Sequence, residues 1–350
     1  MYRIAWLPEN LNNNKSFFGF KKATVLAGAE NITEKELYEN PRAVDYLILN
    51  FYEDIQKKIG FHVIAYVGRI IRLFYFKFCG IKIVWIVNNK VPHDDNKKWA
   101  IRMMKRLIKA SYKIIILCND SLDVLRTLLP EEKKWKDKVF YLPHPNYIGS
   151  YNESDFLECS NDDVFHILFF GSIRPYKNVD VLIKAFNEVK NDKMTLTIAG
   201  GCKSSEYKKY IQSLASKSPI QLILEYIDDD DIMSLILKNT IMVFPYDNET
   251  TLNSGSVILA CSAAKTFISP NIGTVKDFSD KTLFYTYDYS DEQDHIEKLA
   301  GMLRKAYDDF IENRKILVEK GQKLKKYMME KHCTEVLAKI FKEELFTELN

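Results

Sequence analysis

Residues 166–186 read HILFFGSIRPYKNVDVLIKAF, and the apolar period changes once within this stretch. Residues 167–170 are apolar at every position, which is typical of a parallel strand buried on both faces. After Gly171 and a short polar loop, apolar residues recur over residues 179–189 at the spacing of an amphipathic helix. The stretch therefore predicts a buried strand, a turn and a helix, the repeating unit of a doubly wound α/β sheet.

Two cations, Arg174 and Lys177, lie in the polar loop after Gly171. In an open α/β sheet, ligands bind beyond the carboxyl ends of the strands, where cations beside free backbone N–H groups favour an anion such as a diphosphate. Two surface cations in an ordinary loop would give the same pattern. The spacing alone leaves both interpretations open.

A second stretch with the same order of features covers residues 244–265, FPYDNETTLNSGSVILACSAAK. An apolar strand ends there, a polar loop follows, and Ser254, Gly255 and Ser256 open an apolar helix. Their backbone N–H groups and two hydroxyls would surround one anion-sized space. An ordinary capped helix, with Gly255 for close packing, is the alternative. Because both stretches follow strands of one domain, a joint phosphate site is favoured over either site alone.

Length and cysteine usage bound the class of protein. The chain has 350 residues, enough for about two domains, and 47% of them are hydrophobic. Its six cysteines are scattered without a Cys-x-x-Cys pair, and residues 1–10 lack the pattern of a secretory signal. We therefore expect reduced thiols, no structural zinc and a cytoplasmic protein.

Charge is distributed unevenly along the chain. Residues 1–150 carry 25 Lys and Arg against 15 Asp and Glu, a net charge of +10, whereas the remaining residues sum to −7. A basic half invites nucleic acid, anionic lipid or phosphorylated ligands. No signature of a nucleic-acid-binding domain accompanies the charge, so no nucleic acid is expected as a partner.

Strands alternating with helices predict an α/β domain on each side of residues 149–163. That stretch is polar, mostly acidic and aperiodic. We expect it to link a first domain of residues 1–148 to a second of residues 164–330. Residues 331–350 are expected to end in a helix that packs back on the first domain.

Residues 97–109, KKWAIRMMKRLIK, predict an amphipathic helix. Its polar face is basic and carries Lys98, Arg102, Lys105 and Lys109. With Trp99 and Met103 beside it, such a face could bind an anionic bilayer from the side, although an ordinary surface helix would look the same. Residues 61–87 are more apolar still, but four cations interrupt them, so a helix and a strand are expected there and not a membrane span.

Three other features have two interpretations each. The four carboxylates of residues 228–231 could bind a metal, but they precede an apolar helix, so an N-cap with a favourable first-turn charge is preferred. His93 and His144 lie in proline-bearing loops after expected strands, where they could orient a hydroxyl or phosphate or could simply be exposed. Motifs of serine hydrolases, P-loop proteins and ordinary dehydrogenases are absent.

Taken together, these residues resemble the GT-B fold glycosyltransferases of the GT4-like, group 1 kind. The resemblance rests on FFGSIRPYKNVDVLIKAF at residues 169–186, LTIAGG at 196–201 and LILEYIDDDDIMSLILKNTIMVFPY at 222–246. It implies an α/β fold of two Rossmann-like doubly wound domains that face a cleft. The first domain would bind the acceptor, and the second the nucleotide-sugar.

The resemblance also implies roles for individual residues. Arg174 and Lys177 would clamp the donor diphosphate. Glu249 would lie near the sugar, and His93 would match a histidine of the cleft; these four are the implied catalytic residues. His144 falls on a Pro-His stretch at the hinge, which implies that it faces the cleft on the acceptor side. Donor binding is implied for nine other residues: Gly171, Gly200, Gly201, Tyr226, Ile227, Tyr246, Ser254, Gly255 and Ser256.

Two positions depart from the family pattern. Leu259 stands where a second glutamate is common, and since leucine cannot hydrogen-bond a ribose diol, ribose contacts must come from elsewhere. Asn88 stands where a first cleft histidine is usual.

The function that the resemblance implies is retaining glycosyl transfer, without a metal or other cofactor, from a nucleotide-sugar donor to a saccharide or lipid-linked saccharide acceptor. Cell-surface polysaccharide or glycolipid synthesis is the expected context. The basic front half would meet an anionic membrane on its inner face, as a peripheral protein. Another GT-B enzyme, such as a sugar-nucleotide epimerase or a phosphorylase, and an inactive nucleotide-sugar-binding homologue are the alternatives.

Overall fold

The computed structural model describes residues 1–9, 14–54, 62–90, 97–152, 163–216 and 218–346. The chain forms two compact units, a front unit of residues 1–145 and 331–350 and a rear unit of residues 146–330. Most of the expected linker, residues 153–162, lies outside the described residues.

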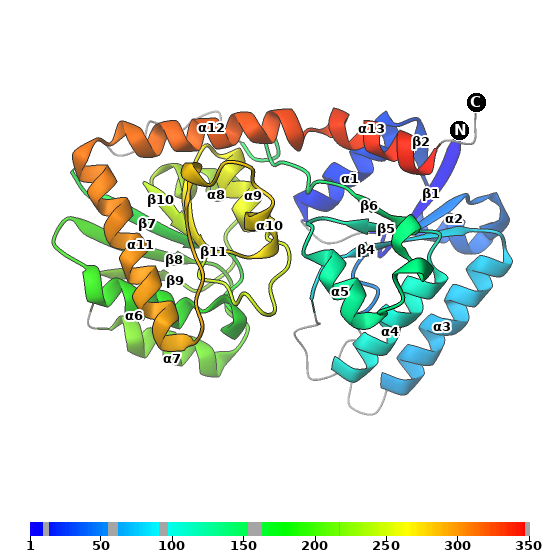
Figure 1. The fold of residues 1–350 in the computed structure, drawn as a ribbon, viewed down its shortest axis with the longest axis horizontal. Helices are drawn as coiled ribbons and strands as arrows, with labels where there is room; N and C mark the ends of the chain where they lie inside the picture. The colour runs from blue at the N-terminus through cyan, green and yellow to red at the C-terminus, as the bar shows by residue number, and fades with distance from the viewer. Residues whose placement is uncertain (10–13, 55–61, 91–96, 153–162, 217, 347–350) are drawn as a thin grey trace. The chain divides into compact units, whose positions relative to one another are not determined.

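The front unit is built on a parallel sheet of six strands in the order β2-β1-β3-β4-β5-β6 (Figure 1). The strands are β1 (Tyr2–Leu7), β2 (Ala29–Asn31), β3 (Tyr46–Leu49), β4 (Lys82–Val87), β5 (Lys113–Ile116) and β6 (Val139–Tyr141). The helices are α1 (Lys15–Leu26), α2 (Glu34–Glu39), α3 (His62–Phe78), α4 (Lys97–Ala110), α5 (Ser121–Leu128) and α13 (Thr334–Leu345). Strand β3 is buried at every position, as a parallel strand covered on both faces should be.

Helices α1 and α13 cover one face of this sheet, and α3, α4 and α5 cover the other (Figure 1). Phe17 of α1 and Phe341 of α13 pack into one core with alternate residues of the strands. The Tyr46 hydroxyl of β3 donates a hydrogen bond to the Leu345 carbonyl. The end of the chain is therefore an integral layer of the front unit.

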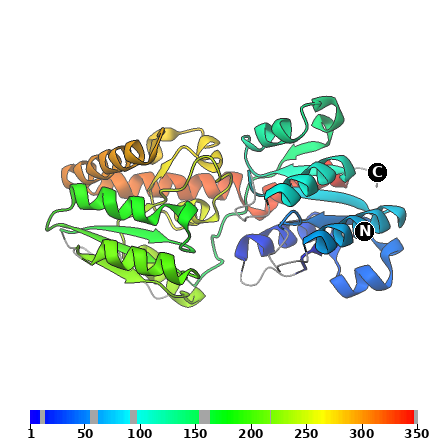
Figure 2. The same cartoon turned by 90° about the horizontal axis from the view of Figure 1, so that it is seen from below.

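The rear unit has a second parallel sheet of six strands, in the order β12-β11-β10-β7-β8-β9, with helices on both sides (Figures 1 and 2). The strands are β7 (Phe165–Phe170), β8 (Met194–Ala199), β9 (Ile220–Ile223), β10 (Ile241–Val243), β11 (Phe267–Pro270) and β12 (Tyr285–Tyr287). The helices are α6 (Val179–Val189), α7 (Ser205–Ala215), α8 (Asp229–Leu237), α9 (Gly255–Ser262), α10 (Gly273–Lys276), α11 (Glu292–Glu312) and α12 (Lys315–Lys331). The predicted α/β class is thus confirmed in both units.

The strand order of the rear sheet reverses between β7 and β10. From β7 the chain adds β8 and β9 on one side, and from β10 it adds β11 and β12 on the other. In open α/β sheets, ligands bind beyond the carboxyl ends of the two strands at such a reversal. The strand and helix predicted within residues 166–186 are β7 and α6, so Gly171 follows one of these two strands and Tyr246 follows the other.

Helix α4 exposes Lys98, Arg102, Lys105 and Lys109, as predicted. Met103 is fully buried, so the expectation that it lies beside the basic face is wrong. At 3.6 residues per turn, Met103 falls with Met104 and Leu107 on the side that packs against the sheet. Among the described residues, none of the helices is both long enough and apolar enough to cross a bilayer.

Candidate functional site

The backbones of Gly171 and Gly200 approach each other closely where β7 and β8 end. The backbone of Gly200 has a φ of +143°, and a Cβ atom there would lie 2.0 Å from the carbonyl oxygen of Gly171. The Gly171 amide donates to the Ala199 carbonyl at 3.1 Å, and the Ile173 amide donates to the Gly201 carbonyl at 2.9 Å. Only glycine permits this approach at position 200, because any side chain would strike backbone.

Three elements converge on Gly171. A Cβ atom placed on this glycine would lie 3.2 Å from the Ser256 hydroxyl oxygen and 4.0 Å from the Tyr246 hydroxyl. Ser256 belongs to the first turn of α9, and Tyr246 follows β10. The structure therefore brings the two predicted stretches, residues 166–186 and 244–265, to one place at the reversal of strand order.

Lys177 contacts Tyr246, one of the residues that approach Gly171. It ends the 3₁₀ turn Pro175–Lys177, and its ammonium nitrogen lies 3.6 Å from the centre of the Tyr246 ring. That ring is fully buried, and its hydroxyl has no hydrogen-bond partner among the described residues. The Asp247 amide donates to the Tyr176 carbonyl at 3.1 Å, which ties the two loops together. Arg174, three residues before Lys177, is exposed.

The start of α9 is partly used by the protein itself. Ser254 is buried, its hydroxyl oxygen accepts from the Val257 amide at 3.2 Å, and its own amide donates to the Thr274 hydroxyl at 3.0 Å. Ser254 thus caps α9, as expected if this stretch is an ordinary capped helix. Gly255 and Ser256 are half-exposed, and the first amides of a helix have no partner within it, so they present N–H groups beside Gly171.

Glu249 lies in the loop between β10 and α9. The Asp247 carboxylate accepts from the amides of Glu249 and Thr250 at 2.8 and 2.9 Å, and the Asn248 amide donates to the Tyr289 hydroxyl at 3.1 Å. These bonds fix the loop backbone, while the Glu249 side chain is exposed. The loop can therefore hold a carboxylate toward solvent in a set position.

Gly201 lies beside the end of β9. A Cβ atom on Gly201 would come no nearer than 3.9 Å to a neighbour, the Tyr226 amide nitrogen. Tyr226 exposes 62% of its surface, and Ile227 is half-buried against the core. An exposed ring next to an open backbone could stack a planar group such as a nucleotide base.

Two residues singled out by the sequence have structural roles. Leu259 is buried in the rear core, on α9. Asp228 occupies the N-cap position of α8 but makes no capping hydrogen bond with its side chain, and the other three acids fall in the first turn, where carboxylates favour the helix dipole. Among the described residues, no three His, Cys, Asp or Glu side chains gather as a metal site would require.

In the front unit, His93 lies outside the described residues. His144 is described, and a ring nitrogen, Nδ1, lies 2.8 Å from the Pro145 carbonyl oxygen. Burial lowers the pKa of His144 to about 4, so its ring is neutral at pH 7. Asn88 donates to the Asn50 side chain at 2.6 Å. The expected place of His144 in a cleft stays a prediction.

Sequence reasoning missed a polar pocket of about 430 Å³ in the front unit. It lies beyond the carboxyl ends of β1 and β3, and its polar lining comes from Glu34, Asn50, Asp54, Arg69 and Arg72. The Arg69 guanidinium donates to the Tyr52 and Asp54 carbonyls and so holds the loop after β3. The signal in the sequence was the pair Arg69 and Arg72, three residues apart in the otherwise uncharged residues 63–76.

A buried carboxyl group stands next to this pocket. Glu53 has no exposed surface; the Trp85 indole donates to one of its oxygens at 3.1 Å, and the other oxygen has no partner among the described residues. Burial raises the pKa of Glu53 to about 7, and the neighbouring Asp54 charge adds to the effect. Glu53 therefore titrates near neutral pH.

Comparison with known proteins finds a family match for the rear half. Residues 152–324 match the model of the glycosyl transferases group 1. The GDP-mannose:glycolipid 4-beta-D-mannosyltransferase of Xanthomonas campestris pv. campestris is 24% identical over 199 residues, which are 57% of this chain and 52% of that protein. The chain thus spans about half the length of the curated relatives it matches. The predicted resemblance to this family is confirmed, and the match extends on both sides of the quoted stretches, which lie within residues 169–246.

Solved structures of glycosyltransferases share the fold of the whole chain. Anabaena HepE, solved with UDP and glucose, has a TM-score of 0.73 at 11% identity, with 99% of this chain and 100% of that chain covered. WaaG, a glycosyltransferase involved in lipopolysaccharide biosynthesis, has a TM-score of 0.66 at 12% identity, with the same shares covered. At these identities the likeness shows the GT-B fold alone.

Proposed function

Residues 152–324 match the glycosyl transferases group 1, and on that premise we propose that this chain moves a sugar from a nucleotide-sugar donor to a saccharide or lipid-linked saccharide acceptor. The observation that carries the proposal is the convergence of Gly171, Ser256, Tyr246 and Lys177 at the strand-order reversal of the rear sheet. A glycine backbone, a helix start and a half-buried ammonium group together form a site for a diphosphate.

The chemistry follows from where negative charge develops. As the bond between the sugar C1 and the diphosphate oxygen breaks, charge grows on the diphosphate, while the acceptor hydroxyl oxygen forms the new bond to C1 and its proton passes to the leaving diphosphate. Lys177, Arg174 and the Gly255 and Ser256 amides would stabilise that charge, and such preorganised donors are worth roughly 3 kcal/mol each in a dry site. No residue is assigned as a nucleophile.

Other donor contacts come from the neighbouring strand ends. We propose that the nucleotide base lies against Tyr226, Ile227 and the Gly200 to Gly201 backbone, and that Glu249 reaches the sugar. Leu259 is buried, and leucine cannot hydrogen-bond a ribose diol. We therefore propose that the exposed groups around Gly201 supply the ribose contacts. No metal is needed in this scheme, since the cations of the protein meet the diphosphate.

The acceptor is proposed to bind the polar pocket of the front unit. Its two guanidinium groups and two carboxylates can pair with saccharide hydroxyls or with an anionic substituent. His93 and His144 are proposed to complete the acceptor side. The name of the Xanthomonas relative specifies a glycolipid acceptor, and the basic front half agrees with a lipid-linked acceptor at an anionic membrane surface, reached from the cytoplasmic side.

The stereochemical outcome can be measured directly. The family resemblance implies retention at C1, whereas the name of the mannosyltransferase relative specifies a β-linked product. We propose retention. Proton NMR of the first product formed from an α-configured donor decides: an α linkage supports retention, and a β linkage contradicts it.

A thermal-shift screen across UDP-, GDP- and ADP-sugars tests the donor site first. A ligand that binds only the folded state raises the melting temperature, by an amount that depends on its concentration relative to the dissociation constant. We expect one nucleotide-sugar class to stabilise the wild type and to lose most of this effect in Lys177→Ala. Stabilisation without sugar transfer to any acceptor would favour the inactive homologue, and no stabilisation by any nucleotide-sugar would contradict the donor site.

A further inference from the structure

Helix α3 leaves an apolar stripe uncovered along its whole length. The exposed fractions are 65% for Ile64, 44% for Val67, 62% for Ile71, 64% for Phe74 and 83% for Phe78. These positions are three and four residues apart in alternation, so they lie on one side of the helix. Single exposed apolar residues need no explanation, but five in one row mark a contact surface.

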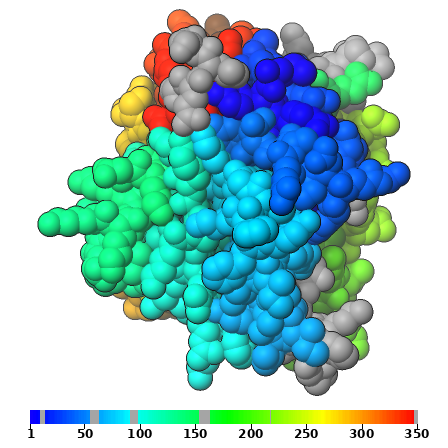
Figure 3. Space-filling model, turned by 90° about the vertical axis from the view of Figure 1, so that its right-hand side faces the viewer, coloured from blue at the N-terminus to red at the C-terminus, as the bar shows by residue number. Residues whose placement is uncertain are grey.

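The neighbouring helix supplies cations and no acids. Lys98, Arg102, Lys105, Arg106 and Lys109 are exposed on α4, and neither α3 nor α4 contains an Asp or Glu. Figure 3 shows the sky-blue surface of α3 beside the cyan-green surface of α4 on one face of the front unit. These α4 cations form no ion pair with the residues that the structure describes; a second copy of this chain would bring the same cations to the contact, whereas an anionic surface would neutralise them.

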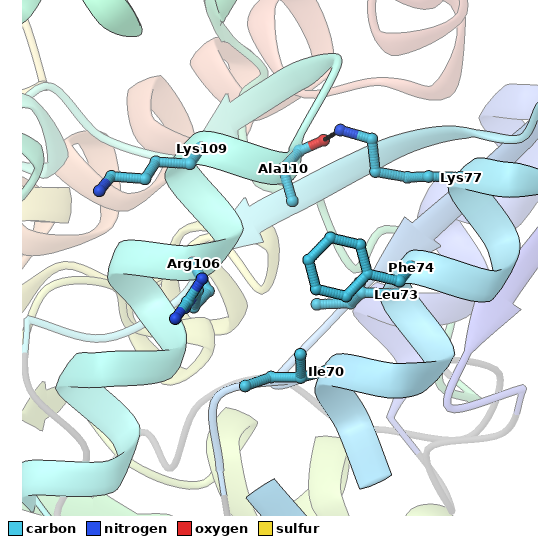
Figure 4. A pocket seen from close by; sticks show the side chains of 7 residues that line it. All are labelled: Ile70, Leu73, Phe74, Lys77, Arg106, Lys109 and Ala110. Atoms are coloured by element: carbon cyan, nitrogen blue, oxygen red, sulfur yellow. Dashed lines mark hydrogen bonds between the residues drawn. The ribbon is translucent and has the colours of Figure 1, made fainter. Parts of the chain in front are cut away.

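A groove of about 190 Å³ runs between the two helices. Figure 4 shows Ile70, Leu73 and Phe74 of α3 on one side, and Arg106 and Lys109 of α4 on the other, with the Lys109 ammonium pointing away from α3. The groove therefore has an apolar floor and a cationic rim.

The cations of the rim are not equivalent. Lys77 donates to the Ala110 carbonyl at 3.0 Å, where it meets the negative end of the α4 dipole. Arg106 and Lys109 form no ion pair with any described residue. Arg106 thus remains to bind an anion beside the apolar floor, which continues into the α3 stripe through Phe74, and Lys109 lies about one turn further along α4.

We propose that α3 and α4 form a membrane-docking face, in which the α3 stripe enters the boundary between headgroups and acyl chains and the groove binds one anionic phospholipid. The lipid phosphate lies at Arg106, and its acyl chain lies along Ile70 and Phe74. Cations that flank an inserted apolar face are the pattern of proteins that bind the membrane interface without spanning it. The proposal deepens the lipid-linked acceptor of the proposed function and adds a lipid site that is separate from the donor site.

Trp99 is a built-in reporter for this face. It is half-buried on α4, its ring centre lies 5.0 Å from that of Tyr66 on α3, and the Arg102 guanidinium lies 4.7 Å above it. The other three tryptophans, at positions 6, 85 and 135, expose at most 1% of their surface. Brominated acyl chains should therefore quench Trp99 selectively, and Trp99→Phe should remove the quenched signal.

The experiment uses the full chain and vesicles of brominated phosphatidylglycerol and phosphatidylcholine, without donor or acceptor. We expect quenching with anionic vesicles at low salt, weaker quenching at high salt, and little with phosphatidylcholine alone. Because each cation near an anionic surface contributes about a fivefold change in partitioning, Arg106→Glu with Lys109→Glu should lower binding at least tenfold. Ile71→Glu with Phe78→Glu should lower it as strongly.

Matched controls separate the face from general charge and hydrophobicity. Lys133→Glu with Lys134→Glu makes the same charge change on an exposed turn, and Val25→Glu alters another exposed apolar residue; both should bind vesicles like the wild type. Equal loss in the controls, or no preference for anionic vesicles, would overturn the proposal. So would concentration-dependent dimers that Phe78→Glu dissociates, since the stripe would then be a protein interface. Donor-induced thermal shifts should persist in all these variants, so a failure here is distinguishable from a failure of the proposed function.

Discussion

The ammonium nitrogen of Lys177 lies 3.6 Å from the centre of the Tyr246 ring, although 68 residues separate the two in the chain. The contact exists because β7 and β10, which precede these residues, are neighbours in the rear sheet. A cation over a buried ring gains up to about 2 kcal/mol, and it loses side-chain freedom before any ligand arrives. The lysine is therefore held in place for an anion at Gly171.

Lys177→Ala and Arg174→Ala are each expected to weaken nucleotide-sugar binding or turnover at least tenfold. Each change removes a charged partner of the donor diphosphate, and charge-assisted hydrogen bonds are the strong ones. Isothermal titration with the donor found by the screen, together with initial rates, would measure the effect. Lys193→Ala is the matched control. Lys193 is an exposed lysine just before β8, so it lies at the amino-terminal ends of the strands, whereas Gly171 lies at their carboxyl ends. Wild-type behaviour of both variants would remove the diphosphate clamp.

Tyr246→Phe is expected to separate stability from donor binding. The Tyr246 hydroxyl is buried without a partner among the described residues, so its removal should leave the free energy of unfolding unchanged or raise it. The same hydroxyl lies beside Gly171 and Ser256, where it can donate to a donor phosphate oxygen. Loss of a hydrogen bond to a charged group should weaken donor affinity about tenfold. An unchanged affinity would mean that the hydroxyl does not face the donor.

Gly200→Ala is expected to destabilise the rear unit by about 3 kcal/mol or more. A φ of +143° strains any other residue, and the added Cβ would lie 2.0 Å from the Gly171 carbonyl oxygen. The neighbouring Gly201→Ala is the control, because its Cβ would meet nothing closer than 3.9 Å. Thermal unfolding followed by circular dichroism should show a lower melting temperature for the first variant only; equal stability of the two would contradict the close crossing.

Local pattern allowed the sequence to predict the elements of the site but not their contacts. The change of apolar period at Gly171 is a property of adjacent residues, and it predicted β7 and α6 correctly. The meeting of Lys177 with Tyr246, and of Gly171 with Ser256, depends on strand order, which no local period encodes. The short elements β2 and α2 were missed because three and six residues carry too little periodicity.

The front unit also contains contacts that local sequence patterns did not predict. Arg69 and Arg72 counted only as interruptions of an apolar segment, because the pocket that they line also depends on the loop after β3, to which Arg69 donates. Met103 was expected beside the basic face of α4, whereas the packing of α4 on the sheet buries it.

Sugar transfer is expected to persist in EDTA. The site proposed for the diphosphate is built from protein cations and amides, and the four acids from Asp228 to Asp231 lie at the start of α8 in a helix-stabilising position. Initial rates with and without chelator, after removal of adventitious metal, would measure this. Activity that is lost in EDTA and restored by Mn²⁺ or Mg²⁺ would show that a metal takes part.

Glu53→Gln is expected to change how the stability of the front unit depends on pH. Burial raises the pKa of Glu53 from 4.5 to about 7 in the folded protein, so between these values the folded state binds more protons than the unfolded state. Stability therefore falls as pH rises from about 4.5 to about 7 and then levels off. A shift of this size corresponds to roughly 3 kcal/mol at pH 8, and the neutral glutamine does not incur it.

Tryptophan fluorescence can follow this effect in the front unit alone, because all four tryptophans, at positions 6, 85, 99 and 135, belong to it. Urea unfolding at pH 5 should give similar stabilities for wild type and Glu53→Gln, whereas at pH 8 the variant should be the more stable. Glu131→Gln alters an exposed carboxylate in the same unit and should follow the wild type at both pH values. A variant that is less stable than the wild type at pH 8 would mean that ionised Glu53 has a partner that stabilises its charge.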